Sequence, residues 1–305
     1  MVCLSKEGVS LSYDPDARAS LLLGDSFSIM RSIPDKTFDL VVTSPPYNIG
    51  KSYETAASLD SYLEGQKSMI RECVRLLKPG GNICWQVGWT KVGNELLPLD
   101  FLIIPIFREL GLTLKNRVIW TFGSGLHARK RFSGRHETIL WFTVDSSEGY
   151  FDLDAVRVPQ KYPDKRHYKG LNKGELSGNP LGKNPGDVWD IPNVKSHHVE
   201  KTLHECQFPV ALVQRLIRAL SPKDGIVFDP YSGVATTSCA AVLESRRSVG
   251  IELDSNYHEI GANRINSALR GSLRFRALEK AIQTPRRYGE TLPLREEPTK
   301  ASANE

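Results

Sequence analysis

Short β-branched runs alternate along the chain with longer segments whose apolar residues recur every three or four positions. The runs at 38–42 and 225–229 are typical of strands that are buried on both faces of a sheet. The spacing at 58–77 and 208–220 predicts amphipathic helices. Further strands are expected at 21–23, 82–87, 117–122, 137–144 and 248–252, and further helices at 28–33, 99–110, 237–244 and 255–269. This alternation predicts an α/β fold with a largely buried sheet.

Glycine and proline mark several ends of these elements. The sequence Lys78-Pro79-Gly80-Gly81 is expected to end the helix at 58–77, with a glycine in the left-handed conformation as its cap. Pro209 is expected near the start of its helix, where a proline is tolerated. Pro105 is expected either to kink the helix at 99–110 or to lie in its first turn.

The strand at 38–42 ends in an unusual polar loop, Thr43-Ser44-Pro45-Pro46-Tyr47-Asn48. Two prolines stop the strand, because each lacks an N–H group and has a fixed φ. They hold Ser44 and Tyr47 in a defined loop. Open α/β sheets bind their ligands beyond the carboxyl ends of strands, so the loop is a candidate site. Taken alone, it is equally compatible with a structural turn.

Two segments lack periodicity and are rich in basic residues. The loop 123–136 carries four Lys or Arg side chains and no acid, and 157–201 carries nine against five Asp or Glu. Such clusters are typical of surfaces that contact phosphates, whereas a solvated loop is the alternative. Tyr150, Phe151, Tyr162, Tyr168 and Trp189 add aromatic faces, which either contact nucleic acid or form a small local core. The candidate DNA contacts are Arg129, Lys130, Arg131, Arg135, Lys165, Arg166 and Lys169.

Bulk properties narrow the choice of class. The 305 residues are 40% hydrophobic, with a formal net charge of +5. The longest apolar run, 101–107, is too short to span a bilayer, and no signal pattern begins the chain, so cytoplasmic residence without a membrane partner is expected. Five scattered cysteines without a Cys-x-x-Cys pair predict neither a metal site nor a redox pair. The tail 284–305 is poor in apolar residues and is expected to be disordered.

A second candidate site follows the strand at 225–229. A strand that ends in Asp229, a loop with Gly233, a helix start at Thr236 and an acid, Glu252, at the end of the next strand are typical of a nucleoside pocket. Glu252 could accept hydrogen bonds from both ribose hydroxyls. No Gly-x-Gly-x-x-Gly or phosphate-loop pattern is present, which favours a nucleoside without phosphates, such as S-adenosyl-L-methionine.

Together the two sites resemble a known family. Leu40 to Tyr47 resembles the catalytic motif of DNA methyltransferases that modify exocyclic amino groups, in the form Thr-Ser-Pro-Pro-Tyr. The segment 228–237 resembles their cofactor loop, and 249–254 resembles their ribose-binding strand end. Gln207-Phe208-Pro209 and Gly24-Asp25-Ser26 resemble their methionine-binding and adenine-binding elements. Ala235 stands where the family usually has a second glycine, and His204-Glu205 where it usually has His-Pro. The order of the motifs is that of the permuted beta class.

The resemblance implies a Rossmann-like fold that uses S-adenosyl-L-methionine, with a mostly parallel twisted sheet, helices on both faces and an irregular inserted target-recognition region. The implied parts are a catalytic half at 20–150, the insert at 151–202 and a cofactor-binding half at 203–270. Double-stranded DNA is the implied substrate, with a homodimer and a companion restriction endonuclease as further implied partners. The implied catalytic residues are Ser44, Pro45, Pro46 and Tyr47, and the implied cofactor contacts are Asp25, Ser26, Gln207, Phe208, Asp229, Pro230, Tyr231, Ser232, Gly233, Thr236, Thr237 and Glu252.

The chemistry of the loop agrees with this resemblance. The lone pair of an exocyclic amine is delocalised into the ring, so acceptors such as the Ser44 hydroxyl and the Pro45 carbonyl are needed to draw its hydrogens out of plane. Tyr47 offers a face on which a flipped base can stack. A serine at position 44 resembles cytosine-N4 enzymes, while adenine N6 remains the alternative. A catalytically silent DNA-binding module, or an enzyme acting on RNA or a small molecule, are the other hypotheses.

Overall fold

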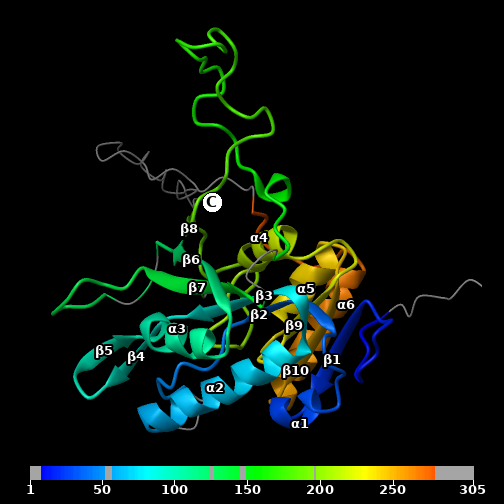
Figure 1. Ribbon diagram of the computed structural model, residues 1–305. Helices are drawn as coiled ribbons and strands as arrows, with labels where there is room; N and C mark the ends of the chain where they lie inside the picture. The colour runs from blue at the N-terminus through cyan, green and yellow to red at the C-terminus, as the bar shows by residue number, and fades with distance from the viewer. Residues whose placement is uncertain are drawn as a thin grey trace, which may run out of the picture.

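The protein folds around one large mixed sheet (Figure 1). The computed structural model describes residues 8–51, 57–123, 125, 127–144, 149–195 and 197–278. Within these residues the sheet has eight strands in the order β1-β10-β9-β2-β3-β7-β6-β8. The five neighbouring strands β1, β10, β9, β2 and β3 are parallel to one another. Strand β7 is antiparallel to both β3 and β6, and β8 is parallel to β6. The strands are β1 Ala19–Leu23, β2 Phe38–Thr43, β3 Leu77–Val87, β6 Thr113–Thr121, β7 His136–Thr143, β8 Val188–Asp190, β9 Ile226–Asp229 and β10 Arg247–Glu252.

Helices cover both faces of the sheet, as expected for this fold class. Alternation along β2 divides the core, because Val41 faces the cluster under the first three helices whereas Leu40 and Val42 face the cluster under α4 and α5. Burial of each such side chain contributes about 1.5–3 kcal/mol. The first group is α1 Ser26–Met30, α2 Leu59–Leu76 and α3 Leu99–Glu109, and the second is α4 Val210–Leu220, α5 Thr236–Leu243 and α6 Ser255–Leu269.

The predicted glycine cap of α2 is wrong. The helix ends at Leu76, and Leu77 is already extended (φ −77°, ψ 140°) and starts β3. The pairing of β2 with β3 shifts register just after this point, between Phe38 and Leu40. Gly80 (φ +73°) and Gly81, where an added Cβ would lie 2.8 Å from the Lys78 carbonyl oxygen, provide that irregularity. The glycines therefore serve a bulge in a strand and not a helix end.

One further element was not predicted from the sequence, and the structure decides between the two alternatives for Pro105. A hairpin of β4 Trp89–Val92 and β5 Glu95–Pro98 follows β3 and was not expected. Pro105 lies inside α3 and not in its first turn. Its position on the exposed side of the helix leaves the missing hydrogen bond facing solvent.

The predicted insert consists of two structurally different parts. Its ends join the body, because the 3-10 turn Asp154–Val156 packs on α4 and β8 pairs with β6. Between them, 158–183 forms an arm that projects away from the sheet (Figure 1, green). Backbone hydrogen bonds between Val158 and Lys183 close its base, and a bridge between Arg166 and Leu176 closes it near the tip. The predicted disordered tail lies outside the described residues.

Candidate active site

The main cavity lies where the direction of the chain across the sheet reverses. From β2 the chain continues outward to β3, and from the neighbouring β9 it continues the other way to β10. Ligands bind at such switch points, beyond the carboxyl ends of the strands. A cavity of about 510 Å³ opens there. It is lined by residues of five segments, at 25–27, 44–47, 204–208, 230–236 and 251–257, and by Met69 of α2.

A buried hydrogen bond fixes the catalytic loop to the cofactor loop. The Thr43 hydroxyl donates to Asp229 Oδ1 at 2.6 Å, and the backbone N–H of Tyr231 donates to the same oxygen at 3.0 Å. Burial raises the pKa of Asp229 to about 6. Asp229 therefore joins the two loops from behind, and neither Asp229 nor Thr237 lines the cavity.

Tyr47 is held by side chains on both sides of its hydroxyl group. Ser44 Oγ lies 3.3 Å from the Tyr47 hydroxyl, and Glu137 of β7 accepts a hydrogen bond from the same hydroxyl. Burial, followed by the charge of Glu137, raises the pKa of Tyr47 well above its usual value. The ring edge rests on Gly88, where an added Cβ would lie 3.0 Å from Tyr47 Cε2. The phenol is therefore neutral and fixed in place.

Backbone N–H groups fix the carboxylate of Glu252. Gly233 donates to Oε2 at 2.7 Å and Asp254 donates to Oε1 at 2.8 Å. Each carboxylate oxygen can accept a further hydrogen bond, so both remain able to bind ligand hydroxyls. Burial raises the pKa of Glu252, and the two N–H groups oppose this shift. Gly233 has φ +52°, which favours glycine, and an added Cβ would lie only 3.2 Å from His204 Nε2.

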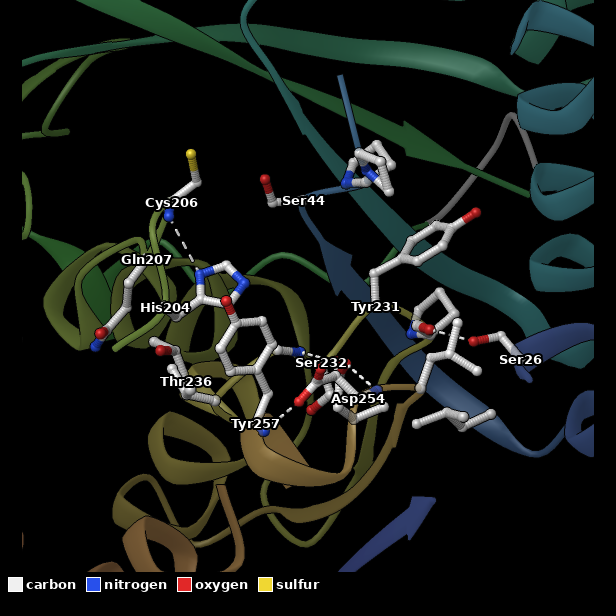
Figure 2. Close-up of a pocket in the computed structure, with 18 of the residues that line it drawn as sticks. Ser26, Ser44, His204, Cys206, Gln207, Tyr231, Ser232, Thr236, Asp254 and Tyr257 are labelled. Carbon is white, nitrogen blue, oxygen red and sulfur yellow. Dashed lines mark hydrogen bonds between the residues drawn. The ribbon is translucent and has the colours of Figure 1, made fainter. Parts of the chain in front are cut away.

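The segment 204–208 forms another wall of the cavity (Figure 2). His204 Nδ1 accepts a hydrogen bond from the Cys206 N–H at 3.2 Å, and its ring packs edge-on against Tyr257. Burial and the nearby Lys201 lower the pKa of His204 to about 4, so the ring is neutral at pH 7. The amide of Gln207 bonds to Thr202 and to the Glu200 carbonyl within the wall. Figure 2 shows Ser44, Tyr231 and Tyr257 around the same cavity.

Ala235 adopts an unusual conformation at the start of α5. Its φ of +59° and ψ of 39° are left-handed, which favours glycine, the residue usual in the family. Space for its methyl group comes from Gly261 of α6, where an added Cβ would lie 3.0 Å from the Ala235 Cβ. A glycine on the facing helix thus makes room for the methyl group of Ala235.

The structure brings most of the predicted site residues together. The cavity is lined by Asp25, Ser26, Ser44, Pro45, Pro46, Tyr47, Gln207, Phe208, Pro230, Tyr231, Ser232, Gly233, Thr236 and Glu252. Nine further lining residues were not among the predicted contacts: Phe27, Met69, His204, Cys206, Val234, Ile251, Leu253, Asp254 and Tyr257. Four of them, Val234, Ile251, Leu253 and Asp254, belong to the two segments that resemble the family's cofactor loop and ribose-binding strand end. The sequence carried one signal for Leu253, because it is an apolar residue directly after the acid at a strand end. The structure leaves it 72% exposed and thus available to cover a base. The sequence also carried a signal for Asp254, because an Asp directly before a predicted helix is a typical N-cap, and Asp254 does cap α6.

The predicted DNA contacts lie on two projections. Arg129, Lys130 and Arg131 are exposed in the loop between β6 and β7, together with the fully exposed Phe132. Lys165, Arg166 and Lys169 are exposed on the arm, where Tyr162 and Tyr168 are 66% and 78% exposed. By contrast, Trp189 and Phe151 pack in or against the body, as the local-core alternative predicted. Arg135 is only partly exposed.

Neither a metal centre nor a membrane span is found in the part of the chain that the structure describes. No three His, Cys, Asp or Glu side chains there could hold a metal ion. No helix among those residues is long and apolar enough to cross a bilayer.

A cavity at a switch point, with a fixed carboxylate on one side and a Ser-Pro-Pro-Tyr loop on the other, defines an α/β transferase with a nucleoside cofactor. Residues 38–263 match the sequence model of the DNA methylase family of N6 and N4 enzymes, and the chain belongs to this family. It is a DNA methyltransferase of the amino-group class, with S-adenosyl-L-methionine as its cofactor.

Several curated relatives have the same character. The chain is 48% identical to the Type II methyltransferase M.BglII of Bacillus subtilis, over 78% of this chain and 66% of that protein. It is 39% identical to the Type II methyltransferase M.ScaI of Streptomyces caespitosus, over 86% of each. The DNA adenine methyltransferase YhdJ of Escherichia coli K12 is 32% identical over 82% of this chain and 83% of its own length.

Solved structures share the fold. The cytosine-N4-specific PvuII DNA methyltransferase superposes with a TM-score of 0.65 at 20% identity, over 88% of this chain and 95% of the PvuII chain. The TTHA0409 protein of Thermus thermophilus, complexed with S-adenosyl-L-methionine, superposes with a TM-score of 0.58 at 26% identity, over 82% of this chain and 96% of the TTHA0409 chain. The predicted fold class and cofactor are thereby confirmed.

Proposed function

We propose that this protein is a sequence-specific DNA methyltransferase that modifies N4 of a cytosine flipped out of the duplex. The observation that carries this proposal is the position of Ser44 and Pro45, which line the same cavity as Glu252. The target amine can thus meet its acceptors beside the cofactor. A serine at this position favours cytosine. Adenine N6 is the alternative, and the similarity to YhdJ supports it.

The residues of the cavity suit S-adenosyl-L-methionine. Glu252 presents a carboxylate fixed by two N–H groups to the ribose hydroxyls, and Phe27, Ile251 and Leu253 provide apolar surface for an adenine ring. Gly233 allows close approach of a ligand to the backbone. The neutral His204 adds no positive charge beside a sulfonium. When bound, the cofactor supplies an electrophilic methyl group.

Protein groups then position the amine. The Ser44 hydroxyl and the Pro45 carbonyl accept its two hydrogens, which turns the nitrogen lone pair out of the ring plane. Tyr47 stacks on the base and offsets part of the few kcal/mol lost on unstacking. The nitrogen gains the methyl group as the methyl–sulfur bond breaks, which leaves a neutral thioether, and the nitrogen then loses one proton to solvent. Positioning of the two reactants provides most of the acceleration, and no covalent enzyme intermediate is needed.

The two basic projections support DNA as the partner. The β6–β7 loop leads directly into β7, which borders the catalytic loop through Glu137. The arm carries exposed tyrosines, and Lys169 lies over the Tyr168 ring at 5.4 Å from its centroid. Basic and aromatic groups together are suited to phosphates and unstacked bases. A homodimer, a companion restriction endonuclease and action in the cytoplasm belong to the same proposal.

Mass spectrometry of nucleosides tests the proposal. Duplex DNA is incubated with the purified protein and labelled cofactor, digested and analysed. N4-methylcytosine is expected. N6-methyladenine would establish the alternative, and label in RNA or small molecules alone would refute DNA modification. The absence of label in any substrate, with cofactor still bound, would favour the silent DNA-binding module.

A further inference from the structure

Glu137 is a carboxylic acid beside the catalytic loop that the proposed function leaves without a role. It is the second residue of β7, and β7 runs antiparallel to β3. Its start therefore lies at the same edge of the sheet as the carboxyl end of β2, where the catalytic loop begins. Gln86 of β3 donates from Nε2 to Glu137 Oε2 and orients the carboxyl group.

The Tyr47 hydroxyl now occupies a position between two hydrogen-bonding groups. Ser44 Oγ lies 3.3 Å from it on one side, and the Glu137 carboxyl group bonds to it on the other. Gly88 accommodates both neighbours, since an added Cβ would lie 3.0 Å from the Tyr47 ring and 3.5 Å from Glu137 Cγ. A group that reached Ser44 in place of this hydroxyl would also face Glu137.

The target base offers two groups with this spacing. In cytosine and in adenine the amine-bearing carbon is bonded to a ring nitrogen that accepts hydrogen bonds. A neutral carboxyl group matches this edge, because its O–H can donate to the ring nitrogen. Its other oxygen can share with the Pro45 carbonyl the amine hydrogen on that side, and the second amine hydrogen is left for Ser44. Burial raises the pKa of Glu137, which favours the neutral form, while Gln86, Lys195 and Tyr47 act in the opposite direction.

We propose that Glu137 binds the amine edge of the flipped base, and that the base takes over from the Tyr47 hydroxyl at both Ser44 and Glu137. This inference rests on the proposed function. Tyr47 is then released from these partners and can present its ring to the base. Glu137 fixes the rotation of the base in its plane, so that one amine hydrogen points at Ser44. Since both bases share this edge, the inference is the same for cytosine and adenine.

The test combines protein variants with altered bases. Glu137→Gln keeps one donor and one acceptor, Glu137→Leu removes both, and Glu64→Leu on exposed α2 is the matched control. Each is assayed in single-turnover transfer on a normal duplex and on one whose target is 3-deazacytosine or 1-deazaadenine, which lacks the ring nitrogen. Cofactor affinity is measured in parallel by calorimetry.

We expect Glu137→Leu to slow transfer about 10–30-fold, as for two lost hydrogen bonds, with cofactor affinity unchanged. Glu137→Gln and the control should stay within a few fold of the wild type. The deaza base should slow the wild type and Glu137→Gln severalfold but should not slow Glu137→Leu further. The inference would be overturned if the deaza base slowed Glu137→Leu as much as it slows the wild type, or if Glu137→Leu were fully active on normal DNA. If Glu137→Leu does not fold, an unchanged rate of Glu137→Gln on the deaza base would also overturn it. Absence of transfer by the wild type would refute the proposed function itself.

Discussion

The two sides of the cavity are held in different ways. On the cofactor side, backbone N–H groups fix the carboxylates: Gly233 and Asp254 bind Glu252, and Ser28 binds Asp25. On the base side, side chains bind one another, as in the series Ser44, Tyr47, Glu137 and Gln86. A partner that is a backbone N–H group moves only when its loop moves, whereas a partner that is a side chain can leave by rotation about one of its own bonds.

This difference teaches where rearrangement is expected. The cofactor side is preformed, which lowers the cost of ordering it when a ligand binds. The base side satisfies its own hydrogen bonds until a base replaces them. Substitutions on the cofactor side should therefore alter affinity, and those on the base side should alter the rate of transfer.

The largest effect is expected for Ser44→Ala. This change removes an acceptor for the target amine, and loss of one preorganised hydrogen-bonding group in an active site slows reactions about 10²–10³-fold. Single-turnover transfer into duplex DNA at saturating cofactor measures it, with Ser32→Ala in the exposed turn after α1 as control. A rate of Ser44→Ala within threefold of the wild-type rate would contradict a role for the Ser44 hydroxyl as an acceptor for the target amine.

Glu252→Ala should weaken cofactor binding about 10–100-fold, since hydrogen bonds to a charged group contribute about 1.5–3 kcal/mol. The variant also leaves the N–H groups of Gly233 and Asp254 without their acceptor. Titration calorimetry with S-adenosyl-L-methionine measures the dissociation constant. Glu259→Ala on the exposed side of α6 is the control, and equal affinities for all three proteins would contradict the ribose contact.

Replacement of Lys130 and Arg131 by Ala should affect neither side of the cavity directly. The slope of log affinity for DNA against log salt should become shallower by about 1.8, as for two lost phosphate contacts. A filter-binding series at several salt concentrations measures it. Replacement of Arg31, the exposed residue that follows α1, and of Arg71, exposed on α2, by Ala changes the net charge equally and should leave the slope unaltered. Equal slopes for the two double variants would mean that the β6–β7 loop does not contact the DNA phosphates.

The smallest effect is expected at Ala235, whose left-handed backbone on the cofactor side is strained. Ala235→Gly relieves a left-handed alanine and should change the free energy of unfolding by at most about 1 kcal/mol, in the stabilising direction. Gly261→Ala should destabilise, and less so when combined with Ala235→Gly, because their Cβ atoms would lie 3.0 Å apart. Urea titrations of the four proteins measure this coupling. Strict additivity would mean that the contact does not limit packing.

Sequence patterns predicted the parts of the molecule that local chemistry determines. The parallel strands and their covering helices followed from apolar spacing, and the Ser-Pro-Pro-Tyr loop followed from two prolines at a strand end. The bulge at Gly80 and Gly81 could not be distinguished from a helix cap, because glycine suits both. Its identity depends on the pairing of β3 with β2, which is a tertiary contact.

Other site residues were hidden because their position depends on strand order. Glu137 reaches Tyr47 only because β7 lies antiparallel beside β3. Gly261 accommodates Ala235 only because α6 packs on α5. Asp229 looked like a cofactor contact from its place at a strand end, yet it bonds to Thr43 behind the cavity. Sequence distance gave no sign of these pairs.

The division between the two sides is tested most directly by a comparison of Tyr47→Ala with Glu252→Ala in single-turnover transfer as the cofactor concentration is raised. Glu252→Ala should recover most of the wild-type rate at saturating cofactor. Tyr47→Ala should bind cofactor as the wild type does and stay about 5–150-fold slower at every concentration, as expected for a lost stacking contact of 1–3 kcal/mol. Recovery of Tyr47→Ala at saturating cofactor, or equal losses of affinity in both variants, would contradict the account.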